Sequence, residues 1–235
     1  NGTIRMQRLQ AHSIVQEDDR AITHDELLRW LQFCVTGINQ PVALPRNPAY
    51  LDALLANQEL WTGVVPRLGR KFMQVVSIDG YPMESYPGIL SALAEQPSEY
   101  RWSTRFIFLD GHEAVKNIEK YRARWRQKVR GFFDQVFNLG SGQINLDAAS
   151  MVADADQMLA DINSGDVAAG YYTSLVVLFD ENRNALEESA RRLEKAINAF
   201  GFTARIETVN TMDAYLGSLP GHGVENVRRP VLHSL

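Results

Sequence analysis

Residues 171–207 read YYTSLVVLFDENRNALEESARRLEKAINAFGFTARIE, and this stretch decides the fold. It begins with a run rich in aromatic and β-branched residues, which predicts a strand over Tyr171–Phe179. Apolar residues then recur at three- and four-residue spacings, which predicts a helix over Arg183–Phe200 that ends at Gly201. A second apolar run predicts another strand over Phe202–Glu207. The stretch is therefore a strand–helix–strand unit.

A similar unit lies earlier in the chain. Strands are predicted over Phe72–Ile78 and Trp102–Leu109, and Pro87–Gln96 is predicted to form the helix between them. A last helix over Asn210–Leu216 follows the second unit. Two βαβ units in series are the order of a split βαβ, ferredoxin-like sandwich, so the sequence predicts an α+β fold.

Between the two units, the chain has the pattern of a long helical hairpin. Apolar residues at helical spacing predict one helix over Glu113–Phe137 and a second over Ala148–Ile162. Gly140-Ser141-Gly142 supplies the turn that reverses the chain. We therefore expect the hairpin as an insertion at about residues 112–165 of the sandwich.

The residues before the first unit predict a small helical segment. Thr23-His24-Asp25-Glu26 has the pattern of a capping box, with a hydroxyl at the N-cap and a carboxylate three residues on, and Gly37 is the expected C-cap. A Pro-rich loop follows, and then a short helix around Tyr50–Ala56. The predicted domains are a helical and irregular lead-in over residues 1–69 and an α+β domain over residues 70–235.

Composition excludes several classes of protein. The 235 residues are 45% hydrophobic and 22% charged, with 24 Lys and Arg against 28 Asp and Glu, so wholesale disorder is excluded. No apolar run approaches the length of about 18 residues that a membrane-spanning helix needs. Cys34 is the only cysteine, which excludes an internal disulfide. The chain opens without a basic and apolar leader, so we expect a cytoplasmic location.

Searches for the chemistry of an active site find nothing in the sequence. It contains no G-x-x-x-x-G-K-[ST] pattern, no G-x-G-x-x-G after a strand, and no G-x-S-x-G. The five histidines lie far apart, and Cys34 falls on the apolar face of a predicted helix. We therefore expect no catalytic, cofactor-binding or metal-binding residue, and no enzyme activity, in this chain.

Charge is unevenly distributed along the predicted hairpin. Residues 116–130 carry seven basic side chains and one acid, whereas residues 131–182 carry no Lys or Arg and many carboxylates. Tyr121 and Trp125 interleave with the cations, as in surfaces that bind phosphates and stack on bases. Alternatively, the basic and acidic helices neutralise each other. The candidate interaction face, called the basic face below, consists of Lys116, Lys120, Arg122, Arg126 and Arg130.

Several strings occur in the order in which one protein family carries them. They are YLDALLA (50–56), PRLG (66–69), YPG (86–88), YRWSTRFIFLD (100–110), ADAD (153–156), ETVN (207–210), YLGSLPGH (215–222) and NVRRP (226–230). On these strings the chain resembles the amino-terminal region of the TrbE-type conjugal-transfer ATPases, in the VirB/CagE/TrbE family of type IV secretion systems. The resemblance extends over about residues 23–235.

The resemblance implies a non-catalytic assembly or docking domain of a larger ATPase. In the family, the Walker motifs that use ATP and Mg²⁺ follow the NVRRP string, so no catalytic residue is implied here. The parent would energise pilus assembly or substrate translocation as a cytoplasmic protein, peripheral at the inner membrane. Implied partners are other subunits of the secretion ATPase and inner-membrane secretion components, with an anionic lipid surface as a further candidate. The alternative is a single-stranded nucleic-acid-binding module of a DNA-transfer machine.

Overall fold

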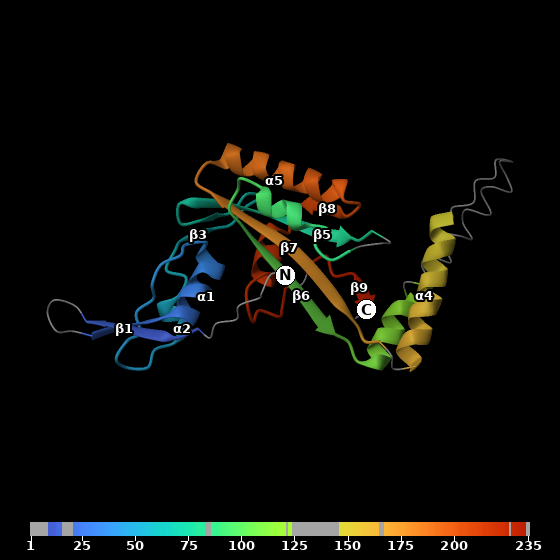
Figure 1. The fold of residues 1–235 in the computed structure, drawn as a ribbon, viewed down its shortest axis with the longest axis horizontal. Helices are drawn as coiled ribbons and strands as arrows, with labels where there is room; N and C mark the ends of the chain where they lie inside the picture. The colour runs from blue at the N-terminus through green and yellow to red at the C-terminus, as the bar shows by residue number, and fades with distance from the viewer. Residues whose placement is uncertain are drawn as a thin grey trace. The chain divides into compact units, whose positions relative to one another are not determined.

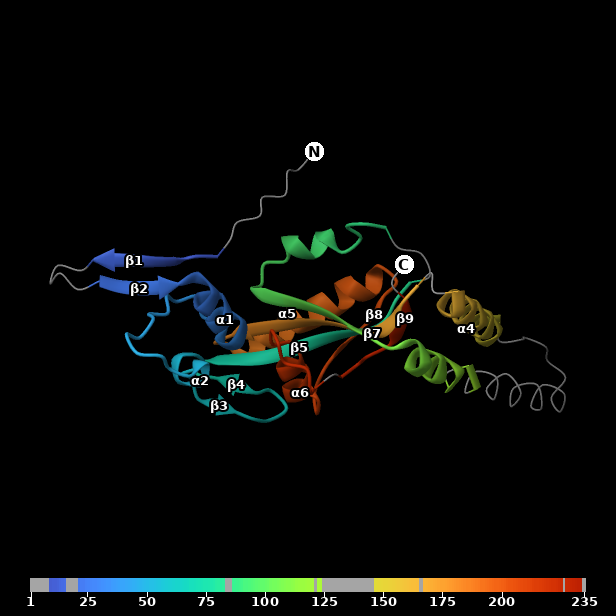
Figure 2. The ribbon, with the colours of Figure 1, turned by 90° about the horizontal axis from the view of Figure 1, so that it is seen from below.

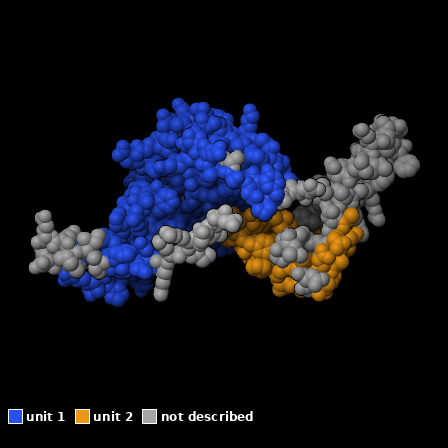
Figure 3. Space-filling model, viewed as in Figure 1, with its two compact units in different colours: residues 1–103, 174–227 blue, residues 104–173, 228–235 orange. Residues whose placement is uncertain are grey.

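The computed structural model describes residues 9–15, 21–82, 86–120, 122–123, 146–164, 167–225 and 227–233. The chain forms two compact units, each described here by itself (Figure 3). The first unit comprises Asn1–Ser103 and Ser174–Val227, and the second comprises Thr104–Thr173 and Arg228–Leu235. The boundary at residue 70 that the sequence suggests is a different division of the chain, and it stays a prediction.

Among the described residues, seven strands form one sheet in the order β3-β4-β5-β7-β6, with β8 paired to β5 and β9 paired to β7. Antiparallel pairing joins β5 to β7, from Phe72 opposite Asp180 to Ile78 opposite Ser174. Strand β8 is also antiparallel to β5. The bounds of the strands are β3 Leu60–Trp61, β4 Arg67–Leu68, β5 Lys71–Gly80, β6 Tyr100–Phe108, β7 Ala169–Asp180, β8 Thr203–Ile206 and β9 Val231–His233.

In the first unit, β5 and β7 bury apolar side chains on both faces. Successive side chains of a strand point to opposite faces, so Val76 and Ile78 join one buried cluster while Met73 and Val75 join the other. Strand β7 divides in the same way. Continuous apolar runs of this kind are what a sheet covered on both sides requires.

Helices cover the two faces of this part of the sheet (Figures 1 and 2). The first face packs against α5, Arg183–Ala199, and the 3-10 helix η1, Ser91–Glu95; α6, Thr211–Gly217, packs on the second. The side chain of Asn182 accepts hydrogen bonds from the backbone N–H groups of Asn184 and Ala185 and so caps α5. The buried stripe of α5 is Leu186, Ala190, Leu193 and Ile197.

The amino-terminal portion of the chain differs from its prediction. Antiparallel strands β1, Ala11–Val15, and β2, Ala21–Asp25, precede α1, Glu26–Thr36 (Figure 2). The predicted start of a helix at Thr23 is therefore wrong, because Asp25 is the N-cap and accepts from the N–H of Leu28. Glu26 cannot complete a capping box because its carboxylate accepts from the backbone N–H of Gln10, beside β1.

Later elements follow the predictions more closely. Gly37 ends α1 in the left-handed region, as expected for a C-cap, and α2, Leu51–Leu54, forms within the predicted short helix. Between β5 and β6, however, the chain forms only the short η1 where a helix over Pro87–Gln96 was expected. The α+β class is confirmed. The ferredoxin-like detail stays an interpretation: β8, β5, β7 and β6 follow one another in the required order, but α-helix is missing from the described residues of the first crossover.

The second unit contains the described residues of the predicted hairpin. Residues 111–120 and 122–123 are helical, and Asp110 caps their start by accepting from the N–H of Glu113. The second helix is α4, Leu146–Ser164. Residues 124–145, which include the rest of the first predicted helix and its turn, lie outside the described residues. The buried core of this unit is Ala114, Ile118, Leu159 and Ala169.

None of the helices in the described ranges of the chain is long and apolar enough to cross a membrane.

Candidate functional site

The structure describes three of the five residues of the basic face. Lys116 and Lys120 are exposed on the helix of residues 111–123, one turn apart. Arg122 is turned toward α4, where its Nη1 lies 2.8 Å from Asp156 Oδ1, and its side chain is only 26% exposed. Arg126 and Arg130 lie outside the described residues.

These positions separate the two interpretations of the basic face residue by residue. Arg122 takes part in the neutralisation of one helix by the other, because Asp156 on α4 compensates its charge. For Lys116 and Lys120, no carboxylate among the described residues forms an ion pair. Of the described cations of the basic face, these two lysines are therefore the ones available to a partner.

A second site lies in the first unit, where two of the family strings meet. Arg101, on β6, donates from Nη1 to the backbone carbonyl of Ser218 and from Nη2 to the hydroxyl of Ser218, each at 2.8 Å. The hydroxyl of Ser103 donates to the same carbonyl at 3.1 Å. Ser218 is the C-cap of α6. These bonds join the YRWS residues of one string to the YLGS residues of another, a contact between segments 117 positions apart that no local pattern in the sequence reveals.

Helix α1 is attached to the same junction. The hydroxyl of Tyr215, on α6, donates to the backbone carbonyl of Val35, on α1. The ring of Tyr215 also packs edge-on against Phe179 of β7, with ring centroids 6.4 Å apart. Gly37 lies against the same Phe179 ring, and a Cβ added there would be 3.0 Å from it. The end of α1 is therefore held against β7 and α6.

Burial changes the acid–base behaviour of this junction. It raises the pKa of Tyr215 to about 12, although the Arg101 guanidinium opposes the change. Burial also raises the pKa of the Cys34 thiol, and it lowers the pKa of Arg101. The phenol and the thiol are thus neutral at pH 7, which leaves Arg101 as the charged member of the junction.

The charge of Arg101 is only partly compensated. Its guanidinium has five N–H groups, and Nε has no hydrogen-bond partner among the described residues although it is buried. The carbonyls at the end of α6 carry the partial negative charge of a helix C-terminus, which favours a cation there. No carboxylate of the described residues pairs with Arg101. A full negative charge is therefore missing beside it.

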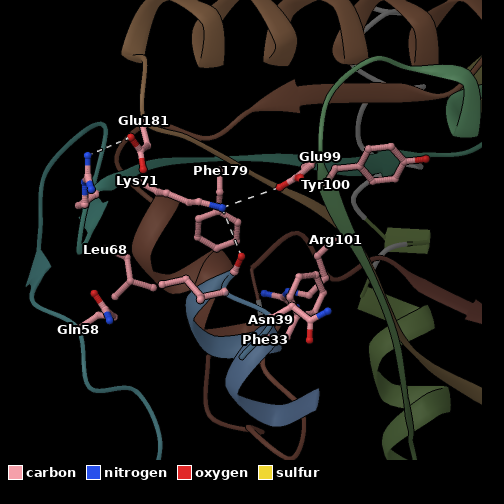
Figure 4. Close-up of a pocket in the computed structure, with 13 residues that line it drawn as sticks. Phe33, Asn39, Gln58, Leu68, Lys71, Glu99, Tyr100, Arg101, Phe179 and Glu181 are labelled. Atoms are coloured by element: carbon pink, nitrogen blue, oxygen red, sulfur yellow. Dashed lines mark hydrogen bonds and ion pairs between the residues drawn. The ribbon is translucent and has the colours of Figure 1, made fainter. Parts of the chain in front are cut away.

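Arg101 lines a pocket of about 740 Å³, called the Arg101 pocket below (Figure 4). Its wall is partly apolar, from Phe33 of α1, Leu68 of β4 and Phe179 of β7. The charged residues of the lining are Arg70, Lys71, Glu99, Arg101 and Glu181. The pocket thus combines aromatic surface with three cations and two carboxylates.

The two carboxylates of the lining are already engaged by the other two cations. Arg70 lies 3.6 Å from Glu181, and Lys71 lies 3.8 Å from Glu99 (Figure 4). The side chain of Glu99 is 87% exposed, and an ion pair with so exposed a partner is weak and readily replaced. Lys71 also approaches the backbone carbonyl of Gly37 at 3.4 Å. The lining keeps one net positive charge, and Lys71 is held loosely beside it.

The structure brings no catalytic constellation together. Within the described ranges, no group of three or more His, Cys, Asp or Glu residues is placed to hold a metal ion. Cys34 is buried, as its place on the apolar face of a helix predicted. The described residues thus define an α+β domain with two charged surfaces, the basic face in the second unit and the Arg101 pocket in the first.

Comparison with known proteins places this domain in a family. The chain belongs to the CagE, TrbE, VirB family, a component of the type IV transporter system, whose model matches residues 13–228. The resemblance found in the family strings is thereby confirmed.

Two relatives in conjugal transfer share nearly half of their matched residues with the chain. A probable conjugal transfer protein TrbE of Sinorhizobium fredii is 46% identical over 233 residues, which cover 99% of this chain and 35% of that protein. The conjugal transfer protein TrbE of Rhizobium radiobacter is 47% identical over 215 residues, or 92% of this chain and 26% of the relative.

A more distant relative is the type IV secretion system protein PtlC of Bordetella pertussis, which is 24% identical over 223 residues. The match covers 93% of this chain and 25% of PtlC. The chain therefore spans about a third or less of the length of the relatives that it matches.

Proposed function

We propose that this chain is a non-catalytic assembly and docking domain of a type IV secretion ATPase that energises pilus assembly or substrate translocation. The observation that carries the proposal is the extent of the family match. It covers residues 13–228 of the chain, yet the chain spans only 26–35% of its conjugal-transfer relatives. The use of ATP and Mg²⁺ is assigned to other regions of the parent protein.

Docking is proposed to occur at the cytoplasmic side of the inner membrane, through the basic face. Lys116 and Lys120 support this because both are exposed and neither is paired with a described carboxylate. Complementary charge guides association and fixes the orientation of partners. The proposed partners are other subunits of the secretion ATPase and inner-membrane components, with anionic lipid beside them.

Vesicle binding tests this use of the basic face. The chain is sedimented with vesicles of phosphatidylcholine alone or with about a third phosphatidylglycerol, as wild type and as K116E/K120E. Each lysine near an anionic surface contributes about 1 kcal/mol, so reversing two of them should weaken binding at least about tenfold. Lys195→Glu, on the exposed side of α5, makes the same kind of charge change in the first unit and should have no comparable effect. Equal binding of wild type and K116E/K120E would remove the basic face from the proposal.

The second candidate function is single-stranded nucleic-acid binding by the same lysines. A labelled oligonucleotide, followed by fluorescence anisotropy at low and moderate salt, separates the two. Phosphate binding weakens steeply as salt rises, in proportion to the number of phosphates neutralised. A salt-dependent rise in anisotropy that K116E/K120E abolishes would favour the nucleic-acid function, and a flat titration at low salt would exclude it.

A further inference from the structure

Helix α1 exposes an apolar stripe that the fold does not use. Leu27, Trp30 and Phe33 are 47%, 46% and 37% exposed, and their spacing of three residues puts them on one side of the helix. The other side is buried, with Leu28 and Gln32 turned inward. Exposed apolar residues that form a continuous patch, especially with a Trp, mark surfaces that bind another protein.

The α1 stripe leads into the Arg101 pocket. Phe33 belongs to both, because it ends the stripe and lines the pocket beside Asn39 (Figure 4). A ligand that covers the stripe would therefore enter the pocket at Phe33. The volume of about 740 Å³ lies within the range of pockets that bury a ligand of several side-chain sizes.

Charge decides which kind of ligand fits. Arg101 has no carboxylate partner among the described residues, and the partner of Lys71, Glu99, is almost fully exposed. A carboxylate brought into the pocket would compensate the first cation and compete for the second. Hydrogen bonds between ionised partners are about twice as strong as neutral ones. The ligand should thus carry one negative charge next to apolar groups.

We propose that the Arg101 pocket and the α1 stripe together bind an acidic, apolar segment of a partner protein. One carboxylate of the segment pairs with Arg101 and Lys71 inside the pocket, and its neighbouring aliphatic or aromatic side chains cover Phe33 and Trp30. A free small anion would leave the stripe exposed, which is why a protein segment fits the site better. This surface is separate from the basic face, so the inference goes beyond the docking function proposed above and does not depend on it.

The probe for this site is the blocked peptide acetyl-Leu-Trp-Phe-Asp-amide, titrated into the ¹⁵N-labelled chain and followed by NMR. The matched control peptide has Asn in place of Asp, which keeps the size and removes the charge. The Asp peptide should shift the amide signals of Gly37, Asn39 and Lys71 and the indole signal of Trp30, with at least fivefold higher affinity than the Asn peptide. Equal affinity of the two peptides, or no shift at these signals, would overturn the proposal.

Variants test each half of the site. Lys71→Glu should weaken the Asp peptide at least tenfold, and Phe33→Ser should weaken both peptides, whereas Lys195→Glu on α5 should bind as wild type does. Arg101 also braces α6 through Ser218, so its replacement is not used as the primary test. If Lys71→Glu binds the Asp peptide as tightly as wild type does, the carboxylate does not enter the pocket and the proposal is wrong.

Two further arms identify the ligand class and keep the two proposals apart. Sodium acetate at matched ionic strength supplies the carboxylate without the apolar groups and should displace the peptide only at far higher concentration. Displacement at equal concentration would show a simple anion site and would overturn the protein-segment assignment. K116E/K120E should bind the Asp peptide normally while losing the vesicles, so a failure of one surface does not imply a failure of the other.

Discussion

The sheet of the first unit and the helices of the second are stabilised by cores of very different size. Strands β5 and β7 are buried on both faces, between α5 with η1 on one side and α6 on the other. The helix of residues 111–123 and α4 share a core with four buried members, and the rest of their described surface is largely polar. A core of many interlocking side chains leaves little freedom for change, whereas a small core leaves most of a helix surface open to partners.

The largest expected effect is on the larger core. Ile197→Ala removes a fully buried side chain of α5 and should lower the free energy of unfolding by about 3–5 kcal/mol, the upper range for such a cavity. Ile118→Ala in the second unit should cost less, about 2 kcal/mol, because the surrounding core is small and can relax. Urea unfolding measures the first value, and hydrogen exchange resolved by peptide shows whether the second change stays within the second unit. A larger loss for Ile118→Ala would reverse the comparison.

Alkaline pH should weaken the junction of the first unit. The pKa of Tyr215 is raised to about 12 in the folded chain, against about 10 when unfolded. A raised pKa means that folding favours the protonated phenol, so its contribution is complete below pH 10 and is lost as pH rises toward 12. The loss amounts to about 3 kcal/mol.

Thermal unfolding of wild type and Tyr215→Phe between pH 8 and 12 measures this loss. The other tyrosines and lysines titrate in both proteins, so only the difference between the two curves is informative. Tyr215→Phe should be less stable at pH 8, where it lacks the hydrogen bond to Val35, and the gap should narrow as pH rises. A gap that stays constant would show that Tyr215 titrates normally.

The end of α1 should tolerate no side chain. Gly37→Ala forces a left-handed residue, at φ 67°, to carry a Cβ that would lie 3.0 Å from the Phe179 ring. We expect a loss of about 1–2 kcal/mol in the free energy of unfolding. Gly111→Ala is the matched control in the second unit, since its Cβ would meet nothing within 4 Å. Similar stability of the two variants would contradict the assigned role of Gly37.

The smallest effect is expected between the two helices of the second unit. A double-mutant cycle of Arg122→Ala and Asp156→Ala should give a coupling of about 0.5–1 kcal/mol, because Arg122 is only partly exposed. The coupling should fall as salt is added. A coupling of zero would free Arg122 for the basic face and strengthen the case for a third exposed cation there.

Much of the central sheet could be read from local patterns. Strands β5, β6 and β7 and helix α5 appear close to their predicted bounds because each carries an apolar repeat of the right period. The N-cap of α1 was misplaced for a reason outside its own segment, since Glu26 is used by Gln10. The helix expected over Pro87–Gln96 also shortened to η1. Local patterns thus failed mainly where a distant segment of the chain supplied the partner.

The family and the α+β class were determined by the sequence alone, since ordered strings and apolar periods are properties of the chain itself. The two surfaces were not. Whether a cation of the basic face is available or paired depends on a carboxylate 34 positions away, as Arg122 and Asp156 show. The Arg101 pocket joins side chains from α1, β5, β6 and β7. Only the tertiary structure decided these features, because electrostatic pairing and enclosure depend on distance in space and not on separation along the chain.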